Sequence, residues 1–258
     1  MRTITNSRYV SLLMGVMIAF STMAAAQQQP KEKYQNAVDY TPYAKVLHEF
    51  VNAQGLVDYE GLQKNRREFD RFMDIIEHFD VGTLDETQAK AFWINAYNAV
   101  TLKVVLDAYP VRGIRWINFG LVWEWKRDVA GQKLSLGHIE HKILRPMGDP
   151  RIHFAINCAS IGCPKLPNEP FYPQSLDAQL DHETRRFIND PQKVYLDRKA
   201  NILYFSAIFQ WFKKDFLISH SGITDYIRGY LNEADQDFIN NHKIKTKVLD
   251  YDWGLNKQ

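Results

Sequence analysis

The sequence predicts an α+β fold in which helices pack on a small, mostly antiparallel sheet. Apolar residues recur at helical spacing through most of the chain, whereas strand-like runs are few and short. Residues 43–258 contain no internal repeat, low-complexity tract or linker. We therefore expect this stretch to form a single globular domain.

The first half of the domain is predicted to be helical. Helical spacing of apolar residues predicts helices over about 46–51, 62–76 and 83–109. The third and longest should begin at a capping box formed by Thr83 and Glu86, and Pro110 should end it.

The second half mixes short elements with loops. Residues 111–134 lack periodicity and should turn near 130–132. The elements expected after them are a helix over 135–145 ended by Pro146, a buried strand over 152–157, a loop to Pro170, a helix opened by Pro173, a hairpin of 194–196 with 202–205, helices from 208 and an extended stretch over 245–253.

The N-terminal residues predict export. Arg2 and Arg8 precede an apolar run over 10–20, and small residues at 24–26 then meet a polar segment. This pattern predicts a signal peptide over 1–26, cleaved after Ala26, and a flexible segment over 27–42. The run is too short for a permanent membrane span, so we expect a periplasmic or secreted protein with no membrane insertion after cleavage.

Charge and motifs exclude several partners. The leader carries two arginines and no acidic residue, so its removal takes the formal net charge from +2 to zero. A balanced surface gives no electrostatic reason to expect nucleic acid or an anionic membrane as a partner. The sequence has neither a phosphate-binding glycine-rich loop nor a nucleotide fingerprint, and we expect no cofactor.

The chain has two cysteines, Cys158 and Cys163. In an oxidising compartment such a pair most simply forms a disulfide, and the alternative is a free functional thiol. His153 is the nearest candidate in sequence to lower the pKa of a Cys158 thiol from about 8.5. Two interpretations therefore remain open: a catalytic His153–Cys158 pair, or a buried histidine beside a structural disulfide.

A second polar group precedes the cysteines. His138 and His141 are three positions apart on a predicted helix and could share a metal ion with His153 or a carboxylate. The spacing differs from the His-Glu-x-x-His metalloprotease motif, and a solvated helix surface is the simpler interpretation of His138. Glu140 could orient an imidazole or pair with Arg145.

Two asparagines lie on one side of the long helix, within an aromatic stretch. Buried amides need partners, so Asn95 and Asn98 should either hold a loop through its backbone or face a pocket, where they could orient an imidazole or bind a substrate carbonyl. Asp215 could be the acid of a triad or brace a helix terminus, and we favour the brace. Trp123 and Trp125 could line a groove for an extended ligand or pack over the core.

Several ordered motifs, taken together, resemble the domain of unknown function 547 family from about Tyr43 to the end of the chain. These motifs are Val57-Asp58-Tyr59, residues 91–99, Trp125-Lys126, Ile139-Glu140-His141, residues 149–155, Cys158-Ala159-Ser160, Cys163-Pro164, residues 208–211, Asp215-Phe216 and residues 252–256. The resemblance implies a fold similar to the papain-like and transglutaminase-like superfamily, with a long central helix against a small sheet. In that superfamily a Cys-His-acid or Cys-His-amide set catalyses acyl transfer, but here the central helix carries Asn95 and no cysteine.

Three functions follow from these observations. The first is thiol-dependent acyl transfer on peptide or peptidoglycan-like amides, with Cys158 as nucleophile, His153 as base, and Asn95 or Glu140 orienting the imidazole. The second is a non-catalytic binding module in which a Cys158–Cys163 disulfide is structural and Trp123, Trp125 and Asn98 contact a peptide, glycan or protein ligand. The third is a metal-dependent hydrolase that uses His141, Glu140 and His153.

Overall fold

The computed structural model describes residues 37–258. The predicted signal peptide, and residues 27–36 of the segment that follows it, lie outside the described residues. The first helix begins at Thr41, two residues before the expected start of the domain. Among residues 37–258, no helix combines the length and the apolar composition that crossing a bilayer requires.

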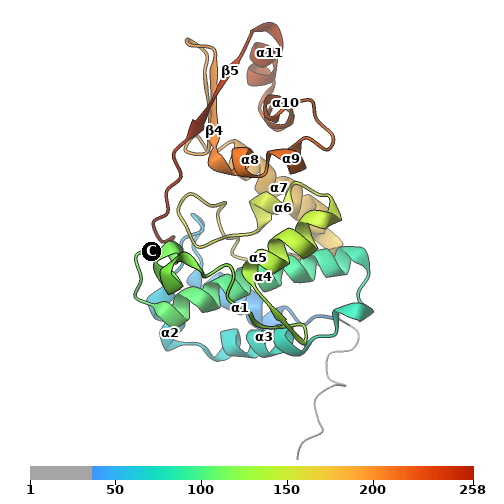
Figure 1. Ribbon diagram of the computed structural model, residues 1–258, viewed down its shortest axis with the longest axis vertical. Helices are drawn as coiled ribbons and strands as arrows, with labels where there is room; N and C mark the ends of the chain where they lie inside the picture. Colours follow the sequence, from blue (N-terminus) through green and yellow to red (C-terminus); the bar gives the residue numbers. More distant parts are fainter. Residues whose placement is uncertain (1–36) are drawn as a thin grey trace, which may run out of the picture. The chain divides into compact units, whose positions relative to one another are not determined.

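The chain is an α+β protein, as predicted (Figure 1). Its α-helices are α1 Thr41–Phe50, α2 Tyr59–Lys64, α3 Arg67–His78, α4 Glu86–Ala108, α5 Leu136–His138, α6 Ile152–Ala155, α7 Leu176–Ile188, α8 Ala207–Trp211, α9 Lys213–Phe216, α10 Ile223–Arg228 and α11 Glu233–Asn241. Between them lie the short 3-10 segments η1 Val81–Thr83, η2 Ile114–Gly120, η4 Arg145–Met147 and η5 Pro173–Ser175, and the π-helical turn η3 Ile139–Leu144.

The strands form two small sheets within the described residues. Strands β1 (Arg127–Val129) and β2 (Gln132–Leu134) make an antiparallel hairpin. The second sheet has the order β3-β4-β5. In it β3 (Val194–Asp197) is antiparallel to β4 (Ile202–Ser206), and β5 (Lys245–Leu249) runs parallel to β4. The hairpin expected over 194–205 is therefore present, and the C-terminal strand makes the sheet mixed.

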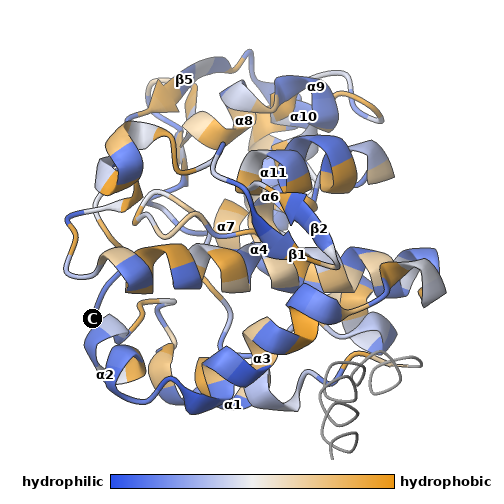
Figure 2. Cartoon of the chain, turned by 60° about the horizontal axis from the view of Figure 1, so that its bottom comes forward, coloured by the Kyte–Doolittle hydropathy of each residue, from blue (hydrophilic) through white to orange (hydrophobic). Residues whose placement is uncertain are grey.

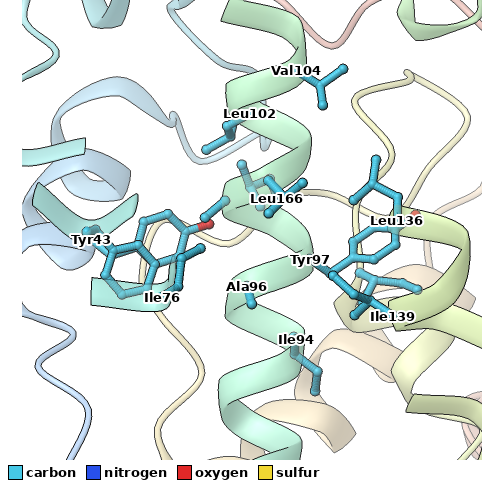
Figure 3. Close-up of a cluster of buried hydrophobic side chains, with 14 of the residues drawn as sticks. Tyr43, Ile76, Ile94, Ala96, Tyr97, Leu102, Val104, Leu136, Ile139 and Leu166 are labelled. Carbon is cyan, nitrogen blue, oxygen red and sulfur yellow. The ribbon is translucent and has the colours of Figure 1, made fainter. Parts of the chain in front are cut away.

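Helix α4 is the longest helix and is buried on nearly every side. Its apolar residues do not form a single stripe, and almost all positions from Ala91 to Leu106 are inaccessible to solvent, as expected of a helix with neighbours all round it. Figure 3 shows Tyr43 and Ile76 on one side of α4, and Leu136 and Ile139 on the other. The helix is long and enclosed, so residues along it can contact several separate segments.

The other helices are amphipathic and cover the core. Helix α3 buries Phe69, Phe72, Ile75 and Ile76, while its remaining face is charged, and Figure 2 shows hydrophobic and hydrophilic segments alternating along it. One hydrophobic cluster surrounds α4, and a second lies under the β3-β4-β5 sheet, centred on aromatic residues of α6 to α10. The domain thus has two aromatic-rich clusters.

The strand expected over 152–157 is wrong. Residues Ile152 to Ala155 form the one-turn helix α6, and the chain becomes extended only at Ile156. The turn before it starts this helix: the backbone N–H of Arg151 donates to Asp149 Oδ1 at 3.1 Å, and the N–H of His153 donates to the Pro150 carbonyl at 3.2 Å. A short apolar run buried on all sides has no period that separates strand from helix.

Three helix boundaries also differ from expectation. The capping box of α4 is formed by Asp85 and Gln88, not by Thr83 and Glu86. The helix expected over 62–76 is divided into α2 and α3 at Asn65, whose backbone leaves the helical conformation at φ −126° and ψ 53°. Its N–H and its side-chain amide both donate to the Gly61 carbonyl and so cap the end of α2. The helix that starts after Ser135 continues past Pro146 to Met147.

Candidate functional site

The site is a cavity of about 260 Å³ lined by residues from both hydrophobic clusters. Its walls come from α4, η3, α6, α8, the segment before β1, the cysteine-containing loop and the C-terminal segment. The lining residues are Tyr97, Trp123, Glu140, His141, His153, Ile156, Cys158, Cys163, Pro164, Ile208, Trp211, Phe212, Tyr251 and Trp253. Most of this surface is aromatic or aliphatic, and the few polar groups are titratable.

The cysteine loop, residues 158–164, is held by an asparagine that directly precedes it. Asn157 Oδ1 accepts the backbone N–H of Ala159 at 2.7 Å, and its Nδ2 donates to the Pro164 carbonyl at 2.6 Å. Asn157 is buried, so both hydrogen bonds are shielded from water. One side chain thus fixes both ends of the loop.

Two asparagines of α4 hold the chain on either side of the cysteine loop. Asn98 accepts the N–H of Asn157 at 2.8 Å and donates to the Ala155 carbonyl at 3.0 Å. Asn95 donates to the Phe171 carbonyl at 2.7 Å and accepts the Phe171 N–H at 3.0 Å. Both amides bind backbone, and within residues 37–258 neither is hydrogen-bonded to an imidazole.

The C-terminal segment closes the other side of the loop. The N–H of Gly162 donates to the Asp252 carbonyl at 2.8 Å. A Cβ atom at position 162 would lie 2.8 Å from both this carbonyl oxygen and the Tyr251 ring. Gly162 therefore allows the ring to approach, and the Tyr251 hydroxyl lies 3.2 Å from the Sγ atoms of both Cys158 and Cys163.

Both cysteines are free thiols in the structure, and their pKa values move in opposite directions. The pKa of Cys158 is lowered to about 7 by hydrogen bonds from Cys163, Ser160 and Tyr251, which outweigh burial. Burial raises the pKa of Cys163 well above its ordinary value, although its Sγ accepts the Cys158 N–H at 2.9 Å. Cys158 is therefore the more acidic of the two thiols.

His153 lies on α6 and is coupled to an acid. Its Nε2 is 2.8 Å from Asp215 Oδ2, and its ring stacks on Phe212 at 4.0 Å. Arg145 also donates to both Asp215 oxygens, at 2.7 and 2.9 Å. Burial lowers the pKa of His153, so the imidazole is neutral at pH 7. Burial acts on Asp215 in the opposite sense, but the hydrogen bonds from His153 and Arg145 outweigh it and hold the pKa of Asp215 well below its usual range.

His153 and Cys158 line the same cavity, but among residues 37–258 no hydrogen bond joins them. Three non-histidine donors support the Cys158 thiolate instead. His153 is held through Asp215, which braces Arg145 and the imidazole together.

Two further polar residues reach the cavity from the π-helical turn η3. Glu140 is buried, and burial together with the negative charge of Cys158 raises its pKa to about 7; the Tyr97 hydroxyl lies 3.3 Å from Glu140 Oε2. The ring of His141 lies 3.3 Å from Arg145 Nη1, and burial lowers its pKa. His138, one turn earlier, is exposed and does not line the cavity.

The tryptophans are divided between the cavity and the surface. Trp123 lines the cavity and meets Trp253 edge to face at 6.2 Å between ring centroids, while Trp211 stacks on Trp253 at 5.7 Å. Trp125 is 53% exposed, lies under the Arg127 guanidinium and does not line the cavity. The predicted pair Trp123 and Trp125 is thus not brought together at one wall.

Tyr251 and Trp253 are site residues that sequence reasoning missed. The motif around residues 252–256 carries part of the family resemblance, but nothing local places it about 90 residues away, beside the cysteine loop. Within residues 37–258, no group of three or more His, Cys, Asp or Glu side chains is arranged to hold a metal ion.

Fold and site together define an α+β protein with an acidic cysteine in an aromatic cavity. Residues 81–188 match the model of a family described as "Protein of unknown function, DUF547", the family that the sequence motifs resemble. The matched residues include α4, η3, the cysteine loop and α7. No curated protein and no solved structure matches the chain.

Proposed function

We propose that the protein is a thiol-dependent acyl-transfer enzyme of the peptidase or amidase kind, with Cys158 as its nucleophile. The observation that carries this proposal is the Cys158 thiol, whose pKa is about 7, in a cavity with two other titratable groups, Glu140 and His153. A thiolate at neutral pH is a strong nucleophile, and an acyl transfer needs a proton donor and a base beside it.

The groups divide naturally between the two half-reactions. In the first, the Cys158 thiolate attacks the carbonyl carbon, a thioester forms, and the departing nitrogen takes a proton from Glu140, which holds its proton up to about pH 7. In the second, His153, neutral and oriented by Asp215, takes a proton from water, which attacks the thioester. This step releases a carboxylic acid and regenerates the thiolate, and the proton that His153 took returns through solvent to Glu140, which restores the starting state.

The cavity walls and the resemblance to papain-like enzymes support a peptide or peptidoglycan-like amide as substrate. In this proposal the cysteine comes from the loop after α6, while the corresponding place on the central helix is taken by Asn95, which holds the chain at Phe171. The predicted leader adds that the enzyme works in the periplasm or outside the cell. Intact mass and N-terminal sequencing of protein from an exporting host test this part.

The direct test is turnover of peptide anilides and thioesters by the wild type and matched variants. Cys158→Ala should abolish turnover, while Cys163→Ala should retain it with a raised Cys158 pKa because one donor to the thiolate is lost. His138→Ala is the control, since His138 is exposed and outside the cavity. Turnover that survives Cys158→Ala would refute the proposal.

The aromatic wall of Trp123, Trp211 and Trp253 favours one second candidate, a non-catalytic binding module stiffened by a Cys158–Cys163 disulfide. Alkylation with and without prior reduction separates the two candidates. If neither cysteine is alkylated before reduction and both are alkylated afterwards, the result supports the binding module. In that case Trp123→Ala should weaken ligand binding more than Trp125→Ala.

A further inference from the structure

The segment between α4 and β1 exposes large apolar side chains that no part of the described chain covers. We call residues 114–126 the aromatic loop. Trp116 is 71% exposed, Phe119 99%, Leu121 58% and Trp125 53%. Four such residues in ten positions exceed the scattered exposed apolar residues that ordinary surfaces carry, and a cluster of this kind marks an interaction site.

The backbone of the aromatic loop holds one of these side chains outward at a cost. Asn118 and Phe119 both have left-handed φ values, 48° and 53°, and Gly120 follows at 84°. Left-handed backbone is unfavourable for a non-glycine residue, particularly a bulky one. In this conformation the Phe119 ring lies almost wholly in solvent, so it buries almost no apolar surface within the domain.

The charged residues around the exposed rings are mostly cationic. Arg112, Arg115 and Lys126 are exposed, and Arg127 lies over the Trp125 ring at 4.5 Å. Glu124 is the acidic residue in this stretch. The near-zero net charge expected of the processed chain conceals this local excess of cations.

Protruding aromatic residues flanked by arginine and lysine match the layered chemistry of an anionic bilayer surface. Tryptophan and phenylalanine partition into the interface, while cationic groups remain at the lipid phosphates. A stable protein interface needs roughly 800 Å² from each partner, more than four side chains on a narrow loop supply. We propose that the aromatic loop docks the protein on a membrane surface that contains anionic lipid.

This docking would bring the cavity close to the membrane. Trp123, from the same loop, lines the cavity, and the Arg115 guanidinium lies 4.8 Å from the centre of the Trp253 ring. The C-terminal segment is also attached to the start of the loop, because the Leu255 N–H donates to the Arg112 carbonyl at 3.1 Å. The inference itself is independent of the proposed reaction.

Sedimentation with vesicles tests the inference. The protein should begin at Gln27 or later, verified by intact mass, so that the apolar run over 10–20 cannot bind lipid; all described core residues remain in this form. Vesicles of phosphatidylcholine with one quarter phosphatidylglycerol are compared with phosphatidylcholine alone. The wild type should bind the anionic vesicles at least about tenfold more tightly, and added salt should weaken this binding.

Matched variants locate the contact. The double variant Trp116→Ser with Phe119→Ser should lose about tenfold or more in binding, whereas Ile218→Ser, at an apolar residue 63% exposed on another segment, should bind as the wild type does. Lys126→Glu should weaken binding, and Lys199→Glu, at an exposed lysine in the β3-β4 turn, should not. Equal circular dichroism and thermal unfolding would show that the variants are folded.

Three outcomes would overturn the inference. These are wild-type protein that binds neither vesicle, a double variant that binds anionic vesicles as the wild type does, and self-association that depends on Phe119 without any vesicle binding. The last outcome would identify a second copy of the chain as the partner of the aromatic loop.

Discussion

Tyr251 places one hydroxyl between two sulfur atoms, and this position explains much of the chemistry of the site. Its oxygen lies 3.2 Å from the Sγ atoms of both Cys158 and Cys163. Burial raises the pKa of Tyr251 far above the working range, so the hydroxyl keeps its proton and can donate it to a thiolate. Hydrogen bonds to a charged group are the stronger kind.

Replacing this hydroxyl should therefore raise the pKa of Cys158. In Tyr251→Phe the thiolate loses one of its donors, and we expect a pKa about one unit higher, which corresponds to about 1.4 kcal/mol. The pH dependence of the Cys158 alkylation rate measures this value. Tyr43→Phe is the matched control, because the Tyr43 hydroxyl is buried without a hydrogen-bond partner. An unchanged Cys158 pKa in Tyr251→Phe would contradict the assigned role.

Glu140 should make both stability and activity depend on pH. Its pKa rises from about 4.5 in the unfolded chain to about 7 in the fold, so its contribution to stability is complete below pH 4.5 and is lost as the pH rises through 7. This loss lowers the free energy of unfolding by about 3 kcal/mol at most. In urea unfolding, the Glu140→Gln variant should not show this decrease between pH 4.5 and 7. If the stability of the variant decreases with pH as much as that of the wild type, another group is responsible for the decrease.

Glu183 provides the control for this experiment. Burial raises its pKa to about 7 as well, but it does not line the cavity. Glu183→Gln should flatten the same stability profile without changing turnover, whereas Glu140→Gln should lower turnover near pH 7. Equal effects of the two variants on turnover would remove Glu140 from the proposed chemistry.

At the scale of elements, the cysteine loop depends on its attachments more than on its own sequence. Asn98 holds the chain before the loop, Asn157 fixes the ends of the loop, and the segment after β5 covers it. The loop itself includes Ala159 with a left-handed φ of 60°. Such a conformation persists only because the surrounding hydrogen bonds impose it.

Removing the Asn98 amide should destabilise the domain. Asn98→Ala leaves the Asn157 N–H and the Ala155 carbonyl buried without partners, and we expect a loss of about 2 to 4 kcal/mol in the free energy of unfolding. Thr101→Val is the control on the same helix, because the Thr101 hydroxyl is buried without a partner and its loss should be nearly neutral. Denaturant unfolding compares the two, and similar costs would contradict the account.

Adding one methyl group to the loop should move the C-terminal segment. In Gly162→Ala the new Cβ overlaps the Tyr251 ring and the Asp252 carbonyl, so the ring must withdraw from the thiols and the Cys158 pKa should rise. Gly222→Ala is the control, since nothing lies within 4 Å of a Cβ at that position. Alkylation profiles identical to the wild type in Gly162→Ala would show that Tyr251 does not need this close approach.

Some elements could be predicted from the sequence because a local signal specifies them. Helix α4 has a long apolar stretch ended by Pro110, and the β3–β4 hairpin has two strand-like runs around a turn. Helix α6 could not, because the hydrogen bonds of Asp149 and Pro150 decide its conformation, not its apolar pattern. The capping box moved by two residues for a similar reason, since Thr83 and Asp85 are both acceptable N-caps.

At the scale of the whole molecule, the site exists because distant segments meet between two hydrophobic clusters. The sequence identified His153, Cys158 and Glu140 as chemically interesting, and all three line the cavity. It could not supply the partners that decide their protonation. Asp215 follows His153 by 62 residues, and Tyr251 follows Cys158 by 93. Contacts at such separations depend on tertiary packing, which local patterns do not record.

The central claim is that tertiary contacts make Cys158 an acidic, accessible nucleophile. The most direct measurement is its alkylation rate by iodoacetamide from pH 5 to 10, followed by peptide mass mapping on natively purified protein. We expect the alkylation rate of Cys158 to reach half its maximum near pH 7 and Cys163 to react far more slowly. A Cys158 that reacts only above about pH 8.5, or a pair already joined as a disulfide, would contradict the account.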